Sequence, residues 1–347
     1  MRFRPPATSE ELPLRIVSIG GGTGLSTLLH GLKQRIQRSV YGFDVDLTAV
    51  VTVTDDGGSS GRLRRDFDVL PPGDIRNCMV AMSEDEALLS RLFQYRFSQG
   101  RGLKGHSFGN LFLTALTDLT GDFGKAVQLS SEVLASYGRI FPSTSANVIL
   151  EATLENGKVI AGETKISKSK SRIVRISLMP DDCAPMKETL AAIAEADLIT
   201  FGPGSLFTSV IPNVLVKGVA QAIQQSPAIK AYFVNLMWQP GETIGFGASD
   251  HVRAIVEHSG VNLLDYAVVN TRPIKEPLRR KYARELAKPV ANDVDVLRDM
   301  GVNVVATELA SGAGEKVRHD PAAIADVAIQ LATESVARRK AQTKGHS

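Results

Sequence analysis

Short apolar runs alternate with glycine-rich or polar loops and with helical patterns along most of the chain. The first run, Arg15–Ile19, leads into a glycine loop and then a helix expected from about Leu25 to Lys33. Three more runs of this kind are Leu47–Val53, Asp197–Phe201 and Lys230–Met237. Because this alternation is typical of βαβ units, we predict a mostly parallel sheet flanked by helices.

Other segments extend this pattern. The runs Tyr266–Asn270 and Val302–Val305 predict two further strands of the same sheet. Residues 75–138 are mainly helical in pattern, and Asp74 is placed to cap the helix that follows it. Apolar residues at helical spacing predict another helix over Glu84–Phe97.

The pattern changes to strict alternation around Asn156-Gly157, a strong hairpin signal. The expected arms are Val148–Leu154 and Lys158–Ile166. The predicted fold class is therefore α/β, with a Rossmann-like sheet and a small β-hairpin insertion. The expected divisions are a single domain at 13–335, the insertion at 139–178 within it, and a basic tail at 336–347.

The composition narrows the class of protein. Of 347 residues, 43% are hydrophobic and 22% charged, which is ordinary for a globular protein. The net charge of +3 is too small to indicate a nucleic-acid partner, and the distant Cys78 and Cys183 provide neither a disulfide framework nor a metal knuckle. With no apolar run near the ~18 residues of a membrane span, we expect a cytoplasmic protein without one.

The densest chemistry follows the second apolar run, in Thr52–Phe67 and the nearby Pro71–Asn77. Two adjacent carboxylates, three glycines, two serines and a group of arginines follow one another in the first of these segments. Ligands of open α/β sheets bind outside the carboxyl ends of the strands, so we expect all four loops to meet at one edge. The alternative for this segment is a solvated turn between a strand and a helix.

The loop Gly20–Gly24 lies between a strand and a helix, where backbone amides attract phosphate. Its ligand-binding candidates are Gly21, Gly22, Thr23 and Gly24. The loop satisfies neither GxGxxG nor the Gly-Lys-Ser/Thr ending of a P-loop, which disfavours an NAD(P)-dependent oxidoreductase and an NTPase. A tight structural turn is the alternative.

Acidic residues suggest a metal or catalytic role. Asp55 and Asp56 follow a buried strand and point to opposite sides, so one can face a ligand while the other braces the loop. Mg²⁺ is commonly held by one or two carboxylates plus substrate phosphates, so Asp55 and Asp56 with Asp74 are the candidate Mg²⁺ ligands. The same three residues and His106 are the catalytic candidates, against capping and structural roles.

Several polar residues complete the candidate binding site. One or two of Arg62, Arg64, Arg65 and Arg76 are expected to meet phosphate or carboxylate. A second anion-binding loop begins at Gly202, and the fourth run ends in amides suited to a base or sugar edge. The remaining ligand-binding candidates are Ser59, Ser60, Arg62, Asn110, Gly202, Gly204, Ser205, Asn235 and Gln239.

Five motifs together resemble the YvcK/CofD-like family, over about Arg15 to Pro321. They are Gly20–Gly24, Asp55–Arg64, Pro71–Asn77, His106–Asn110 and Gly202–Ser205. The resemblance implies a Rossmann-like fold and two branches. One branch transfers a phospholactyl group from a nucleotide-activated donor to a deazaflavin alcohol with Mg²⁺. The other is the gluconeogenesis-factor branch, required for cell shape and for growth on gluconeogenic carbon.

The amino-acid sequences of the Asp55–Arg62 and Pro71–Asn77 motifs resemble those of the gluconeogenesis-factor branch. That branch implies a UDP-sugar ligand, with Tyr282 stacking on the uracil and Arg318 meeting the diphosphate, and attaches no settled reaction. The alternative is an enzyme, an Mg²⁺-dependent 2-phospho-L-lactate transferase.

Two positions depart from the gluconeogenesis-factor branch. Phe207 stands where a tyrosine is usual, and Trp238 stands where a smaller polar residue is expected. Both are expected at the ligand edge, so the sugar preference stays open. The expected partner is a nucleotide sugar; a homo-oligomer and partners in the cell-shape machinery also stay open.

Overall fold

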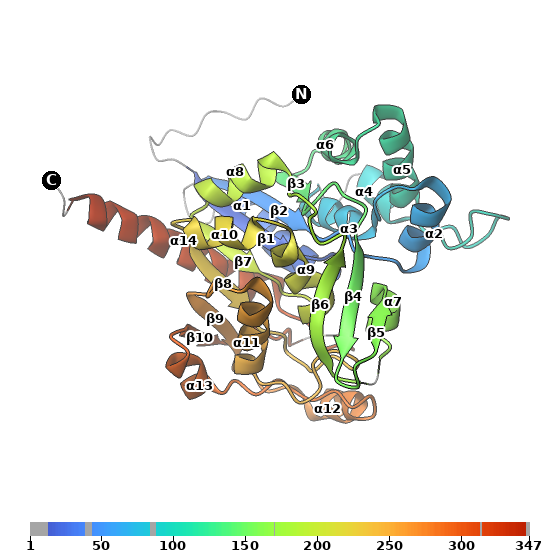
Figure 1. The fold of residues 1–347 in the computed structure, drawn as a ribbon. Helices are drawn as coiled ribbons and strands as arrows, with labels where there is room; N and C mark the ends of the chain where they lie inside the picture. Colours follow the sequence, from blue (N-terminus) through green and yellow to red (C-terminus); the bar gives the residue numbers. More distant parts are fainter. Residues whose placement is uncertain (1–12, 39–43, 84–87, 170, 313, 345–347) are drawn as a thin grey trace.

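The computed structural model describes residues 13–38, 44–83, 88–169, 171–312 and 314–344. A parallel sheet forms its centre (Figure 1). From edge to edge its described strands are β10 (Asn303–Thr307), β9 (Tyr266–Asn270), β8 (Ile229–Phe233), β7 (Leu198–Phe201), β1 (Leu14–Gly20), β2 (Val45–Val51) and β3 (Arg139–Pro142). The predicted parallel α/β sheet is confirmed.

The strand order reverses between β1 and β7. From β1 the chain proceeds through β2 to β3 in one direction, and from β7 through β8 and β9 to β10 in the other. The register is parallel throughout, with Ile16 beside Leu198 and Leu47. Such a reversal opens a crevice at the carboxyl ends of the strands, which is where ligands bind in folds of this kind.

Helices cover both faces of the sheet, which explains why its central strands are apolar on both sides. On one face α1 (Thr23–Gln37) packs against α3 (Gly73–Met82) and α14 (Pro321–Lys344). The other face carries α8 (Lys187–Glu195), α9 (Ile211–Leu215), α10 (Val219–Gln225) and α11 (Ala248–Ser259) (Figure 1). The remaining helices are α2 (Gly58–Phe67), α4 (Leu88–Gln94), α5 (Phe108–Thr120), α6 (Phe123–Val133), α7 (Glu163–Ile166), a π-helix (Leu206–Val210), α12 (Glu276–Ala283) and α13 (Val294–Asp299).

The insertion is a small antiparallel sheet of β4 (Ile149–Leu154), β5 (Val159–Ala161) and β6 (Ile173–Met179). The hairpin at Asn156-Gly157 is present, but its second arm is shorter than expected. Gly162 has φ +99°, and the chain then enters α7. The first residues of the expected insertion, 139–142, form β3 at the edge of the main sheet.

Three further expectations differ from the structure. Helix α3 begins at Gly73, and Asp74 forms no cap hydrogen bond because it already lies inside the first turn. Helix α4 ends at Gln94 and not at the expected Phe97, and residues 84–87 of the expected helix lie outside the described ranges. It buries Phe93 but leaves Leu88 75% exposed. The expected basic tail is helical as far as Lys344, since α14 continues through it.

The described helices differ in length or in apolar character from a membrane-spanning helix. None is alone long and apolar enough to cross a membrane. One bent pair, Leu206–Leu215 with Val219–Gln225, meets the length and composition requirements together.

Candidate functional site

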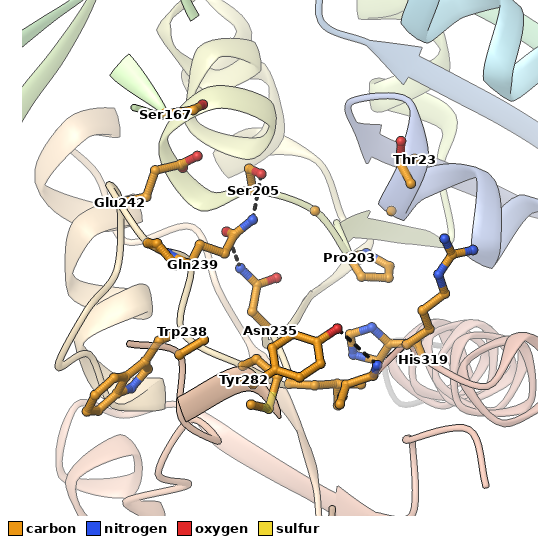
Figure 2. A pocket seen from close by; sticks show the side chains of 18 of the residues that line it. Thr23, Ser167, Pro203, Ser205, Asn235, Trp238, Gln239, Glu242, Tyr282 and His319 are labelled. Carbon is orange, nitrogen blue, oxygen red and sulfur yellow. Dashed lines mark hydrogen bonds between the residues drawn. The ribbon is translucent and has the colours of Figure 1, made fainter. Parts of the chain in front are cut away.

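A cavity of about 510 Å³ lies at the carboxyl ends of β7 and β8, beside the start of α1 (Figure 2). Its volume lies in the range of small-molecule sites. Eight of the predicted ligand-binding residues line it: Thr23, Gly24, Gly204, Ser205, Asn235, Gln239, Tyr282 and Arg318. They come from five separate segments, three of which belong to the loops expected to converge; the fourth loop, which carries Asp55 and Asp56, does not line this cavity.

The glycine loops meet because the chain carries no side chain where they touch. A Cβ on Gly24 would lie 2.2 Å from the carbonyl oxygen of Pro203. Since that atom is backbone, a larger residue would push the first turn of α1 away from the 202–205 loop. Close approach therefore places the start of α1, with its free backbone N–H groups, at the edge of the cavity.

A chain of amide hydrogen bonds crosses the cavity wall. The side chain of Asn235 donates to Oε1 of Gln239 at 2.9 Å, and Nε2 of Gln239 donates to Oγ of Ser205 at 2.7 Å (Figure 2). These bonds fix both amides and leave the side-chain oxygen of Asn235 able to accept from a ligand.

Aromatic and basic residues form the opposite side. The hydroxyl of Tyr282 accepts a hydrogen bond from the backbone N–H of Val317 at 3.1 Å, which ties α12 to the segment that carries Arg318. Burial lowers the pKa of His319 to about 4, so this cavity residue is neutral at physiological pH. A second cavity of about 900 Å³ shares Thr23, Thr27, Arg318 and His319 with the first.

A separate polar cluster between α2, α3 and α5 contains the predicted residues Ser59, Ser60, His106 and Asn110. Oγ of Ser59 and Nδ1 of His106 are 2.9 Å apart, and Oγ of Ser60 accepts from the backbone N–H of Gly73 at 3.1 Å. The amide of Asn110 lies 3.5 Å from Ser60, and its side-chain oxygen has no hydrogen-bond partner among the described residues. Burial and the nearby Arg62 lower the pKa of His106, which favours its neutral form.

The two adjacent aspartates have different surroundings. Asp56 accepts hydrogen bonds from the backbone N–H and the hydroxyl of Thr164, at 2.9 and 2.5 Å, and so holds the insertion against the main domain. Asp55 accepts from the N–H of Gly57 at 2.8 Å, and its other oxygen lies 2.8 Å from the place where a Cβ on Gly73 would be. Asp56 is therefore a bracing residue, whereas Asp55 faces the start of α3.

Asp74 links the cluster to the first glycine loop. Burial and the neighbouring Asp55 raise its pKa to about 7, against the hydrogen bond from the backbone of Gly22. A Cβ on Gly22 would lie 2.3 Å from Asp74, so only a glycine leaves room for the carboxylate. Gly21 also borders Asp74 and Ser209, and Gly202, with φ +74°, forms the turn after β7.

Two glutamates of the site were not predicted. Burial, then the charges of Asp74 and Asp55, raise the pKa of Glu163 to about 9. Burial raises the pKa of Glu242 to about 7, although Phe207 and Thr208 donate hydrogen bonds to it. Glu242 lay in a polar loop after the fourth apolar run, which was the signal available; Glu163 had none.

The structure also shows the contacts of the predicted arginines and of the two positions that differ from the gluconeogenesis-factor branch. Arg62 donates to the carbonyl of Lys104 and Arg64 to that of Val148, so both hold neighbouring loops. Trp238 lines the cavity as expected. Phe207 does not: it is buried against Phe246 and His258, because the π-helix turns it into the core.

The expected Mg²⁺ site was tested against the arrangement of acidic groups. Within the described ranges, no three His, Cys, Asp or Glu side chains are grouped so as to hold a metal ion. Asp55 and Asp74 are nonetheless close enough that one raises the pKa of the other, a repulsion that a bound cation would relieve. The donor set thus fits a cation that also takes oxygen ligands from a phosphate.

Comparisons with known proteins agree with this fold. A family model described as 2-phospho-L-lactate transferase CofD matches residues 16–310. The chain is 45% identical over 315 residues to a protein of Halalkalibacterium halodurans named gluconeogenesis factor, covering 91% of this chain and 95% of that one. It is also 45% identical to the gluconeogenesis factor of Bacillus subtilis, covering 92% and 98%.

Solved structures show the same relationship. A crystal structure of a Bacillus halodurans protein matches with a TM-score of 0.87 and 45% identity, covering 92% of this chain and all of that one. Another, described as a member of the UPF0052 family, matches with a TM-score of 0.86. The chain therefore belongs to the CofD family, among relatives that are named gluconeogenesis factor.

Proposed function

We propose that this protein is a cytoplasmic regulator of the gluconeogenesis-factor type that binds a UDP-sugar in the 510 Å³ cavity. On this proposal it is required for normal cell shape and for growth on gluconeogenic carbon. The observation that carries the proposal is the meeting of Tyr282, Arg318 and the start of α1 around one cavity. These groups offer an aromatic face, a guanidinium and free backbone N–H groups.

Each group suits one part of a nucleotide sugar. The ring of Tyr282 suits stacking on a uracil, and the amide of Asn235 suits its polar edge. The guanidinium of Arg318 and the N-terminus of α1 suit a diphosphate. The missing GxGxxG pattern does not favour a dinucleotide.

A thermal-shift panel tests the proposal. The ligands are UDP-GlcNAc, UDP, GDP, NAD and deazaflavin, each with and without Mg²⁺. A ligand at ~100 times its dissociation constant stabilises the protein by about 2.7 kcal/mol, so a shift with uridine nucleotides is the expected result. No shift with any uridine nucleotide contradicts the proposal. Trp238, the chain's one tryptophan, also lines the cavity and gives an independent fluorescence signal.

A second candidate is a phospholactate transferase, and the pairing of Asp55 with Asp74 favours it. These two carboxylates would hold Mg²⁺, which supplies charge neutralisation to phosphates when bound. Asp56 and Thr164 would keep the loop in place, and Gly22 would position Asp74. A thermal shift with GDP or deazaflavin that requires Mg²⁺ would favour this candidate over the regulator.

A further inference from the structure

Glu242 is a buried carboxylate in the wall of the cavity, and only 6% of its surface is exposed. It accepts hydrogen bonds from the backbone N–H of Phe207 at 3.2 Å and from the hydroxyl of Thr208 at 3.3 Å. No Lys or Arg of the described ranges is among the groups that influence it. A buried carboxylate without a counter-ion costs stability, so packing alone does not account for this residue.

The β insertion covers the same end of the cavity. Ser167, which follows α7, lines the cavity beside Glu242 (Figure 2). Contact with the main domain is close, because a Cβ on Gly241 would lie 2.4 Å from the carbonyl oxygen of Ser167. This end of the cavity is therefore built from two distant parts of the chain.

The two ends of the cavity differ in charge. Thr23, at the start of α1, and His319 lie away from Glu242 in the close view (Figure 2). The cavity's other carboxylate, Glu285, is exposed and close in sequence to Tyr282. A diphosphate is therefore favoured near Thr23 and disfavoured near the Glu242 carboxylate.

We propose that the end of the cavity formed by Glu242 and Ser167 is a subsite for the sugar of the bound nucleotide sugar, with Glu242 accepting hydrogen bonds from sugar hydroxyl groups. This inference rests on the proposed function. A carboxylate has about four acceptor sites, so those not filled by Phe207 and Thr208 are available to hydroxyl donors. The uncharged hydroxyl groups of a nucleotide sugar lie on its ribose and on its sugar; UDP keeps the ribose and lacks the sugar, so a comparison of UDP with a UDP-hexose separates the two.

The experiment compares UDP with a UDP-hexose on the full chain by titration calorimetry. The wild type is expected to bind the UDP-hexose more tightly than UDP. The advantage is the ratio of the affinity for the UDP-hexose to the affinity for UDP. In Glu242→Gln this ratio should fall by about tenfold, equivalent to ~1.4 kcal/mol, while the affinity for UDP stays within about twofold of the wild type. The control Glu257→Gln, an exposed glutamate on α11 outside the cavity, should keep the full advantage.

A second variant is needed because Glu242→Gln changes a buried residue and could impair folding. Ser167 is exposed, so Ser167→Trp should fold normally and obstruct the sugar, again lowering the affinity for the UDP-hexose and not for UDP. If Glu242 only braces the 205–208 turn, Glu242→Gln weakens both ligands in proportion, and the inference fails.

Other outcomes separate this inference from the proposed function. If both variants still bind the UDP-hexose more tightly than UDP by the same factor as the wild type, the subsite is overturned. The proposed function is not, because UDP still binds. An advantage that disappears in EDTA assigns Glu242 to a cation and also overturns the subsite. Failure of the wild type to bind UDP or the UDP-hexose overturns the subsite and the proposed function together.

Discussion

The hydroxyl oxygen of Tyr282 accepts a hydrogen bond from the backbone N–H of Val317, 35 residues further along the chain. The bond joins the end of α12 to the segment that carries Arg318 and His319. A neighbouring contact, from Nζ of Lys281 to the carbonyl of Glu315 at 3.3 Å, supports the same connection. The aromatic and cationic sides of the cavity are thus held as one unit.

Removing the hydroxyl of Tyr282 should weaken ligand binding without abolishing it. Tyr282→Phe keeps the ring but loses the bond to Val317, so we expect a several-fold lower affinity for a UDP-sugar, about 1 kcal/mol. Tyr282→Ala also removes the ring and should lose more. Calorimetry with Tyr95→Phe as control, an exposed tyrosine outside the cavity, checks this. Equal affinities for Tyr282→Phe and Tyr282→Ala would remove stacking from the account.

Loss of Arg318 should abolish binding while preserving the fold. The side chain is exposed and forms no ion pair that the described ranges show, so Arg318→Ala should leave the unliganded melting temperature nearly unchanged. Its UDP-sugar thermal shift should disappear, because no other arginine of the described part of the chain lines this cavity. Arg284→Ala, at the end of α12, is the matched control. A normal shift in Arg318→Ala would remove this residue from the site.

The parallel sheet and the cavity edge were predictable, because they depend on local signals. Apolar runs followed by glycine loops mark strand ends, and the helix start next to Gly24 lies at the cavity as these signals predict. Burial of Glu242 was not predictable, since its partners Phe207 and Thr208 are distant in sequence. Helical spacing likewise predicted that α4 is a helix, but not which part of the protein packs against it. The exposed Leu88 could therefore not be distinguished from the buried Phe93.

Two glycines of the 239–247 loop should respond differently to the same change. Gly241 has φ +85° and Gly245 φ +86°, so alanine is strained by a similar amount at both, about 1–2 kcal/mol. Only at Gly241 would the new Cβ meet backbone, 2.4 Å from the carbonyl oxygen of Ser167; at Gly245 nothing lies within 4 Å. Gly241→Ala should therefore lower the free energy of unfolding more than Gly245→Ala.

The same pair tests how the insertion is attached. Displacement of Ser167 by Gly241→Ala should lower the affinity for a UDP-hexose, whereas Gly245→Ala should not change it. Urea unfolding and calorimetry on both variants provide the two measurements. Equal losses of stability in the two variants would mean that backbone strain, and not the contact with Ser167, sets the cost.

Glu242 should make folding stability depend on pH in a direction opposite to that of most carboxylates. Burial raises its pKa to about 7 in the folded protein, from 4.5 for an ordinary glutamate. Between these values the folded state binds more protons than the unfolded state, so this contribution is complete below about pH 4.5 and is lost as the pH rises to about 7. Its size is on the order of 3 kcal/mol.

The pH dependence of Glu242→Gln isolates this contribution. Asp74 and Glu163, whose pKa values are also raised, remain in both proteins, so most of their effect cancels in the difference. Relative to the wild type, the variant should be least stable near pH 4.5 and should recover as the pH approaches 8. Urea unfolding at several pH values measures the difference. Curves that stay parallel would show that Glu242 ionises in the folded protein as it does in the unfolded chain.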